Sequence, residues 1–164
     1  APELLALFPV ATDEQATRSS YALRRDTTFA YQAWRLASLH AATARSTVYL
    51  FNFMRGVPFA PSRRFHEARP PEGYGAYHGS ELWYAFGTLD ALQAEWGVED
   101  RALSDAMTSA WVSFARTGQP AADALPDWPT FGETGEAMLL DAQVRVSRPF
   151  NEAALGLFRD IWSG

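Results

Sequence analysis

The segment Thr47-Val48-Tyr49-Leu50-Phe51-Asn52-Phe53 decides the fold class of this 164-residue chain. Six of its seven residues are β-branched, aromatic or leucine, so the segment is predicted to be a strand with almost no polar face. A strand that is apolar on both sides belongs inside a sheet that helices cover on both faces. The segment therefore predicts an α/β fold.

The sequence around this strand is mostly helical. A helix is predicted from Asp26, as its cap, to about residue 45, and a second over residues 100–117, ended by Gly118. Asn151 is placed to cap a last amphipathic helix, and residues 138–140 form a short second apolar run. One or two strands cannot build a covered sheet alone. We therefore expect a chain that begins inside a longer protein, whose upstream residues supply the rest of the sheet.

Composition excludes several functional classes. The net charge is -5 and the pI about 5.1, so the chain lacks the basic surface that nucleic-acid binding requires. There is no cysteine, which excludes disulfides and thiolate metal sites and is compatible with a reducing cytoplasm. No apolar run reaches the length of a membrane-spanning helix. The compartment stays open.

Residues 75–87, GAYHGSELWYAFG, contain the strongest candidate for chemistry. Gly75 and Gly79 flank His78, and glycine permits backbone angles or close approaches that a Cβ would block. A histidine in such a loop faces a cleft without crowding by its own neighbours. His78 is therefore the candidate catalytic side chain, and Gly75 and Gly79 are the candidate residues that support its loop.

This segment resembles the histidine-bearing segment of the type B carboxylesterases, the family of para-nitrobenzyl esterases and cholinesterases. In that family a strand similar to VYLFNF precedes the histidine loop, and a helix and tail similar to LSDAMTSAWVSFARTGQPAADALPDWPTF follow it. The resemblance extends from about residue 26 to residue 138. The family's WxxFAxxGxP pattern and its WPxF turn are matched by Trp111, Phe114, Ala115, Gly118 and Pro120, and by Trp128, Pro129 and Phe131.

The resemblance implies the C-terminal part of a single α/β-hydrolase domain that spans residues 1–164 and is incomplete without upstream residues. In such enzymes the triad follows in the chain order Ser, then Asp or Glu, then His. By that order His78 is the general base, and the serine and the acid lie outside this chain, which has no G-x-S-x-G motif. The implied substrate is a small carboxylic ester and no cofactor is implied. The implied partner is the N-terminal part of the same esterase, and a homo-oligomer is possible.

Several alternatives remain open at this level. His78 with Glu81 offers a metal only two ligands, which makes a poor site. Glu81 is interpreted either as a capping-box acid that supports the loop by reaching back to the His78 N–H, or as a first-turn carboxylate favoured by the helix dipole. Asp90, Asp100 and Asp105 are the other acids near enough to consider, but the family order places its acid before the histidine.

Two readings without catalysis compete with the esterase. Some members of the family have lost triad residues and serve as adhesion or binding modules, and the presence of His78 favours the enzyme over them. An independent small helical binding domain is disfavoured by the apolar strand over residues 47–53. Of the other histidines, His40 is expected to pack on its helix and His66 to be solvated.

Overall fold

The computed structural model describes residues 2–66, 73–149 and 151–162. The chain divides into two compact units, each formed from separate stretches of the sequence. The first unit contains Ala1–Leu50, Thr130–Gly135 and Arg148–Gly164, and the second contains Phe51–Pro129 and Glu136–Ser147. The first unit is helical, and the second holds the sheet and the candidate site. No helix within the described ranges is long and apolar enough to cross a membrane.

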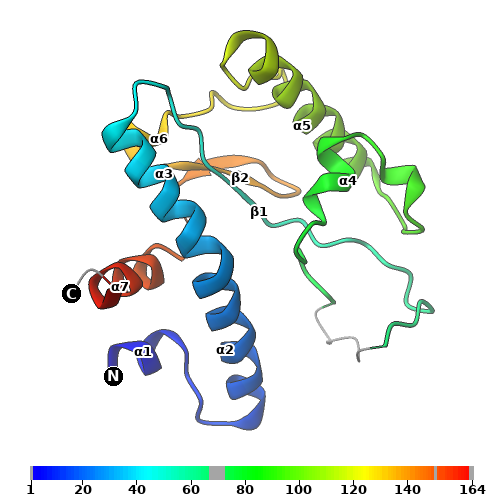
Figure 1. The fold of residues 1–164 in the computed structure, drawn as a ribbon. Coiled ribbons are helices and arrows are strands. Elements are labelled where there is room, and N and C mark those ends of the chain that lie inside the picture. The colour runs from blue at the N-terminus through cyan, green and yellow to red at the C-terminus, as the bar shows by residue number, and fades with distance from the viewer. Residues whose placement is uncertain (1, 67–72, 150, 163–164) are drawn as a thin grey trace. The chain divides into compact units, whose positions relative to one another are not determined.

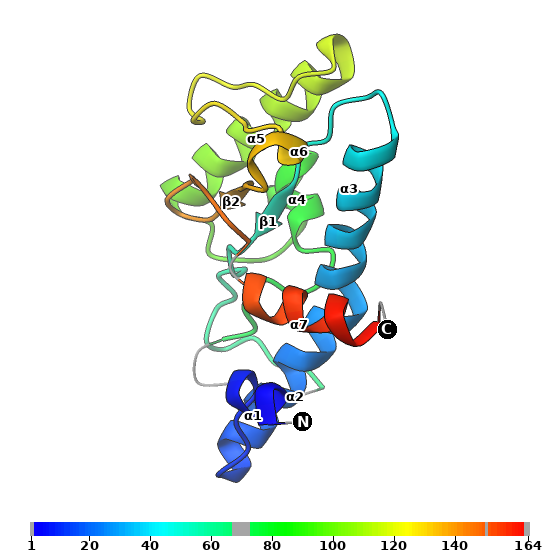
Figure 2. The same cartoon turned by 90° about the vertical axis from the view of Figure 1, so that its left-hand side faces the viewer.

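One long helical rod dominates the first unit. Figures 1 and 2 both show α2 running directly into α3. The rod comprises α2 (Asp13–Arg25), a π-helical turn η1 (Asp26–Ala30) and α3 (Tyr31–Thr43). It begins well before the predicted start at Asp26 because the Thr12 side chain accepts a hydrogen bond from the Gln15 N–H (3.2 Å) and caps the helix there. Asp26, predicted as a cap, instead lies buried within the rod.

Three shorter helices complete the first unit, namely α1 (Pro2–Leu7), α6 (Phe131–Thr134) and α7 (Glu152–Trp162). Phe8, Tyr31, Leu155 and Phe158 form most of its core, which joins α7 to the rod. Helix α7 starts after Asn151 at the predicted position, but the Asn151 side chain does not cap it: Nδ2 donates to the Asp26 carboxylate (3.0 Å), and the buried Oδ1 accepts no hydrogen bond from the described residues. Burial of apolar rings and one buried polar pair therefore fix α7.

The second unit contains a three-stranded sheet in the order β1-β2-β3, where one or two strands were predicted. The strands are β1 (Phe51–Phe53), β2 (Ala137–Leu140) and β3 (Arg145–Ser147). β1 runs parallel to β2, whereas β3 pairs with β2 in the antiparallel direction. All residues of β2 are buried, while β1 is half-buried and shorter than the predicted 47–53 segment. The parallel pair confirms the α/β class, with β2 rather than β1 as the fully buried strand.

Two helices pack with this sheet in the second unit, α4 (Glu81–Ala85) and α5 (Val98–Thr117), with a 3₁₀ turn η2 (Leu89–Ala91) between them. Gly118 ends α5 in the left-handed conformation with a φ of 77°, as predicted. The core of the unit contains residues from α4, α5 and β2, among them Tyr84, Leu103, Met107, Met138 and Leu140. Because α4 begins three residues after His78, the packing of α4 in this core holds the segment that carries the candidate histidine.

Candidate functional site

His78 lies in a turn that leads straight into α4. We call residues 77–80 the histidine turn. The Ser80 N–H donates to the Tyr77 carbonyl (3.0 Å) within the turn, and the Leu82 N–H of α4 donates back to the Gly79 carbonyl (3.2 Å). The His78 side chain is exposed, whereas Ser80, two residues later, is fully buried. The turn therefore presents its imidazole outward while its end is built into the core.

The two glycines beside His78 adopt conformations that other residues rarely adopt. Gly75 has a φ of 60° and Gly79 a φ of 86°, both in the left-handed region. No atom lies within 4 Å of where a Cβ would stand at either position, so the backbone angle, rather than crowding, requires glycine. Of the two expected uses of these glycines, the backbone angle is the one that the structure shows; their support of the histidine loop stays a prediction.

Glu81 is the first residue of α4 and is half-buried, with Ser80 as the N-cap. A capping box would need the acid at the third helical position, so that its carboxylate reaches back to the N-cap. The first position instead suits a carboxylate that interacts with the positive end of the helix dipole. The helix start therefore favours the dipole interpretation of Glu81, and its support of the histidine loop stays a prediction.

An aromatic cluster holds the segment that precedes His78. Tyr77 stacks on the buried ring of Phe59 with centroids 6.2 Å apart, and Tyr74 meets Phe59 edge-on at 6.3 Å. Phe65 packs against both Phe59 and Tyr74, at 4.8 Å and 4.7 Å. The Arg63 guanidinium lies 5.5 Å from the Phe59 and Phe65 rings. The described parts of the loop after β1, residues 59–65 and 74–77, therefore pack around Phe59, which the sequence analysis did not identify.

A buried hydrogen-bond network holds the segment that follows His78. Asp100, 1% exposed at the start of α5, accepts from Arg55 Nε (2.7 Å), the Tyr84 hydroxyl (2.8 Å) and the Gly97 N–H (2.9 Å). The Ser104 hydroxyl donates in turn to the Tyr84 carbonyl (2.9 Å). The network joins the segment just after β1, helix α4 and helix α5. It was missed because its members stand 45 and 16 residues apart in the sequence.

The network also sets the protonation states of its members. Burial alone would raise the pKa of Asp100, but hydrogen bonds from Arg55, the Gly97 N–H and Tyr84 lower that pKa below its ordinary value. Burial raises the pKa of Tyr84, and the bond to Asp100 adds to the increase. The hydrogen bond to Asp100 raises the pKa of Arg55 against the opposing effect of burial. Asp100 is therefore an ionised structural acid paired to Arg55.

The remaining sequence candidates are separate from the histidine turn. Asp90 is exposed and pairs with Arg101 (2.9 Å), and Asp105 is also exposed. His66 is exposed as predicted, but His40 was expected to pack and instead lies exposed in the last turn of α3, with Nε2 2.7 Å from the Ser46 hydroxyl. The described residues contain no group of three or more His, Asp or Glu side chains suited to a metal ion.

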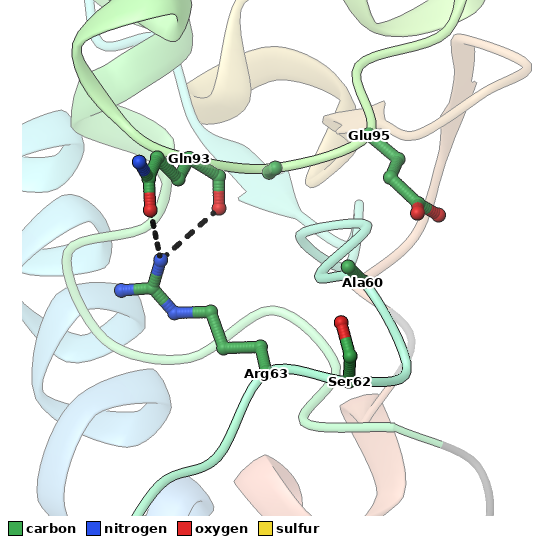
Figure 3. A pocket seen from close by; sticks show the side chains of 6 residues that line it. Ala60, Ser62, Arg63, Gln93 and Glu95 are labelled. Atoms are coloured by element: carbon green, nitrogen blue, oxygen red, sulfur yellow. Dashed lines mark hydrogen bonds between the residues drawn. The ribbon is translucent and has the colours of Figure 1, made fainter.

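One shallow pocket lies in the second unit, with a volume of about 550 Å³. Figure 3 shows its two walls, with the Arg63 side chain turned toward Gln93, whose main-chain and side-chain oxygens accept from Arg63 Nη1 at 3.4 Å and 3.5 Å. Its lining residues are Ala60, Ser62, Arg63, Gln93, Ala94 and Glu95. His78 is not among these residues, so the pocket is distinct from the predicted site.

Comparisons with known proteins agree on one family. A sequence model described as the carboxylesterase family matches residues 9–158. The para-nitrobenzyl esterase of Bacillus subtilis is 37% identical over 100 residues, covering 57% of this chain and 20% of that protein. Carboxylesterase 4A of Bos taurus is 30% identical over 139 residues, covering 85% of this chain and 24% of that protein. The chain thus spans a fifth to a quarter of the length of these relatives.

Solved structures give the same result for the fold. A PNB esterase superposes with a TM-score of 0.68 at 28% identity, covering 96% of this chain and 29% of that one. A carboxylesterase of Geobacillus stearothermophilus superposes with a TM-score of 0.70 at 25% identity, covering 94% of this chain and 31% of that one. The fold is therefore that of part of an α/β-hydrolase.

Proposed function

The chain belongs to the carboxylesterase family, and from that premise we propose that it is the histidine-bearing, C-terminal part of a serine carboxylesterase. The observation that supports this role most directly is His78, exposed on a turn whose flanking glycines both have positive φ. An imidazole presented in this way can reach a hydroxyl on another segment without moving its own backbone. The residues from 1 to 164 are proposed to form part of one hydrolase domain.

In the proposed reaction His78 acts as the general base. It accepts the proton of a serine hydroxyl as that oxygen attacks the ester carbonyl, and it then donates the proton to the departing alcohol. The serine and the acid that orients the imidazole are proposed to lie in residues outside this chain. The substrate class is small carboxylic esters, and this chemistry needs no cofactor from the residues described.

The first experiment changes the base in the complete esterase. His78→Ala and His78→Gln are expected to lower kcat by about 10³-fold or more, because the serine then has no group to accept its proton. The matched controls are His40→Ala and His66→Ala, which remove the two other exposed imidazoles and should leave kcat within about twofold of wild type. Activity of His78→Ala within tenfold of wild type would overturn the assignment.

The second experiment uses the 164-residue chain alone. Its hydrolysis of para-nitrophenyl acetate should not exceed that of its own His78→Ala variant, which controls for free-imidazole chemistry. Adding the separately produced N-terminal part should restore hydrolysis if the two parts dock. Esterase activity from the unmixed chain would show that the nucleophile lies within it, contrary to the proposal. If the two parts dock but the mixture hydrolyses no ester, an adhesion or binding module is favoured instead.

The exposed apolar side chains bear on the proposed partner and on the oligomeric state of the chain alone. Many large apolar side chains are exposed in the chain, including Leu36, Phe86, Val98, Ile161 and Trp162. We propose that the N-terminal part of the esterase covers many of these side chains, because monomers rarely leave much contiguous apolar area exposed. The chain alone is therefore expected to bind hydrophobic dyes, measured by dye fluorescence, or to form homo-oligomers, measured by light scattering.

A further inference from the structure

The segment that carries His78 is attached to the rest of its unit on both sides of the histidine. Before His78, Tyr74 and Tyr77 pack on Phe59, and the Gly75 backbone lies beside Gly56, 3.4 Å from where a Gly56 Cβ would stand. After His78, the attachment is the bond of Tyr84 to Asp100, which also binds Arg55. Apart from the Phe59 packing, the Gly75 approach and the Tyr84–Asp100 network end on two consecutive residues, Gly56 and Arg55. We call these two residues the anchoring pair.

At Gly56, the Gly75 backbone lies on the side where a side chain would project. A Cβ built on Gly56 would lie 3.4 Å from both the carbonyl carbon and the Cα of Gly75. That separation is ordinary van der Waals contact, so one added methyl group fits and a larger side chain does not. Gly75 stands three residues before His78 and has the positive φ that turns the chain toward it. The position of Gly56 thus limits where the histidine turn begins.

The second attachment is the buried network. The Arg55 guanidinium, 24% exposed, donates from Nε to Asp100 Oδ1, and the fully buried Tyr84 hydroxyl donates to the same oxygen. The Ser104 hydroxyl bonds to the Tyr84 carbonyl, so both the ring and the backbone of Tyr84 are fixed. Charge-assisted bonds inside a core are the stronger kind, and each also restricts geometry. Helix α4 is thus fixed six residues after His78.

The anchoring pair itself stands on a rigid base. It follows β1 after a single residue, Met54, whose N–H donates to the Leu140 carbonyl of the buried strand β2 (2.8 Å). Between the two attachments the histidine turn is closed by the bonds from Ser80 and Leu82 described above. The path from the sheet to the imidazole therefore consists of bonded or packed elements throughout.

From this arrangement we propose that Arg55 and Gly56, with Asp100 and Tyr84, are positioning residues that place His78 for general-base catalysis by clamping its segment at both ends. The proposal rests on the proposed esterase function, because it assigns these residues through His78. None of the four is expected to touch the substrate. Their loss should therefore lower kcat by misplacing the imidazole while KM changes little.

The Gly56 contact offers a graded test in the complete esterase. Gly56→Ala adds a methyl at contact distance and should keep kcat within about twofold of wild type, whereas Gly56→Val pushes on Gly75 and should lower kcat about 10- to 100-fold. Gly156→Val is the matched control, because no atom lies within 4 Å of a Cβ built on Gly156. The comparison is made among variants that unfold well above the assay temperature.

The network needs a milder substitution than loss of the arginine. Arg55→Met alone leaves the Asp100 charge buried without its partner and can prevent folding. Tyr84→Phe removes one hydroxyl, and the double variant Arg55→Met with Asp100→Asn removes both charges together. Each is expected to lower kcat about 3- to 30-fold with KM within about twofold of wild type. Tyr31→Phe, which deletes a buried hydroxyl that accepts from Arg35 in the first unit, is the control.

Amide hydrogen exchange at Ser80 and Leu82 provides a readout that does not depend on activity. If the clamp holds the turn, Gly56→Val and Tyr84→Phe should speed exchange at these two amides by about tenfold or more, and the controls should leave it unchanged. Unchanged exchange, or a kcat for Gly56→Val within threefold of Gly156→Val, overturns the proposal. If His78→Ala remains active, the esterase function fails, and the exchange rates still decide whether the clamp exists.

Discussion

Each unit buries one aspartate beside an arginine, and the two sites differ in what they join. Asp26 in the first unit is 2% exposed and accepts from its neighbour Arg25 (2.6 Å) and from Asn151 (3.0 Å). Asp100 in the second unit is 1% exposed and accepts from donors on three separate parts of the chain. The same chemistry thus joins two helices in one unit and supports the histidine turn in the other.

This difference teaches that burial of a charge does not identify a functional site by itself. Arg25 is 48% exposed, so its bond to Asp26 is made partly in water. The Asn151 bond to Asp26 is the one that links the rod to α7. Arg55 is only 24% exposed and belongs to the segment that also contacts Gly75. The functional importance of an aspartate therefore depends on which elements its partners belong to.

The largest expected effect separates the two aspartates. Asp100→Ala leaves Arg55 partly buried without a partner and deletes the bond at the start of α5, so it should cost about 3–5 kcal/mol of unfolding free energy. Asp26→Ala should cost about 1–3 kcal/mol, because its arginine is half in water. Urea unfolding of both variants measures the difference. Equal losses would mean that the number of elements joined does not matter.

A smaller effect compares two glycines, one in each unit. Gly79 has a φ of 86°, so Gly79→Ala should destabilise by about 1–2 kcal/mol through backbone strain alone. Gly156 lies inside α7 with open space around it, so Gly156→Ala should stabilise by about 0.5–1 kcal/mol. Thermal unfolding of the two variants should therefore shift in opposite directions. A shift of the same sign in both would remove the conformational argument for glycine in the histidine turn.

Local signals predicted much of the fold. Gly118 ends α5 in the left-handed conformation as predicted, and α7 starts after Asn151 at the predicted position, although the Asn151 Oδ1 accepts no capping bond from the described part of the chain. Gly75 and Gly79 have positive φ, one of the two uses of glycine that the sequence left open. The family resemblance then placed these elements in an α/β-hydrolase. The role of His78 rests on that resemblance and awaits the substitutions described above.

One error arose at a missed local signal: the rod was expected to start at Asp26, but the Thr12 side chain caps it by accepting from the Gln15 N–H, three residues away. The other errors arose where distant residues decide the structure. The strand over residues 47–53 was expected to be buried along its length, but only 51–53 pair with β2. The Arg55–Asp100–Tyr84 network has no local signature, because its bonds form only once β1, α4 and α5 have packed.

A third prediction concerns the two first-turn acids. If Glu81 acts through the helix dipole, Glu81→Ala and Glu81→Gln should cost the same, about 0.3–1 kcal/mol each, because both remove the charge. If it supports the loop by capping, the glutamine variant keeps an acceptor and should be milder than the alanine variant. Glu152→Gln, at the start of α7 and paired with Arg148 (2.8 Å), is the control in the first unit. Urea unfolding at low ionic strength distinguishes these outcomes.

The last expected effect, which appears only at high pH, tests the protonation of the network itself. The pKa of Tyr84 is raised above its ordinary value of 10.0 by burial and by the bond to Asp100, so the folded protein keeps the hydroxyl neutral when the unfolded chain ionises. The stability that Tyr84 contributes is therefore complete below pH 10 and is lost as the pH rises further, by about 0.8 kcal/mol at pH 10.5.

Urea unfolding at pH 9.0 and pH 10.5 should show this extra loss in the wild type and not in Tyr84→Phe. Trp96→Phe, a change in the same core that removes no titrating group, should keep the wild-type loss. A Tyr84→Phe variant that loses as much stability as the wild type over this interval would show that the hydroxyl is not held neutral. The pH dependence of the network would then come from the Arg55–Asp100 ion pair without a contribution from the Tyr84 hydroxyl.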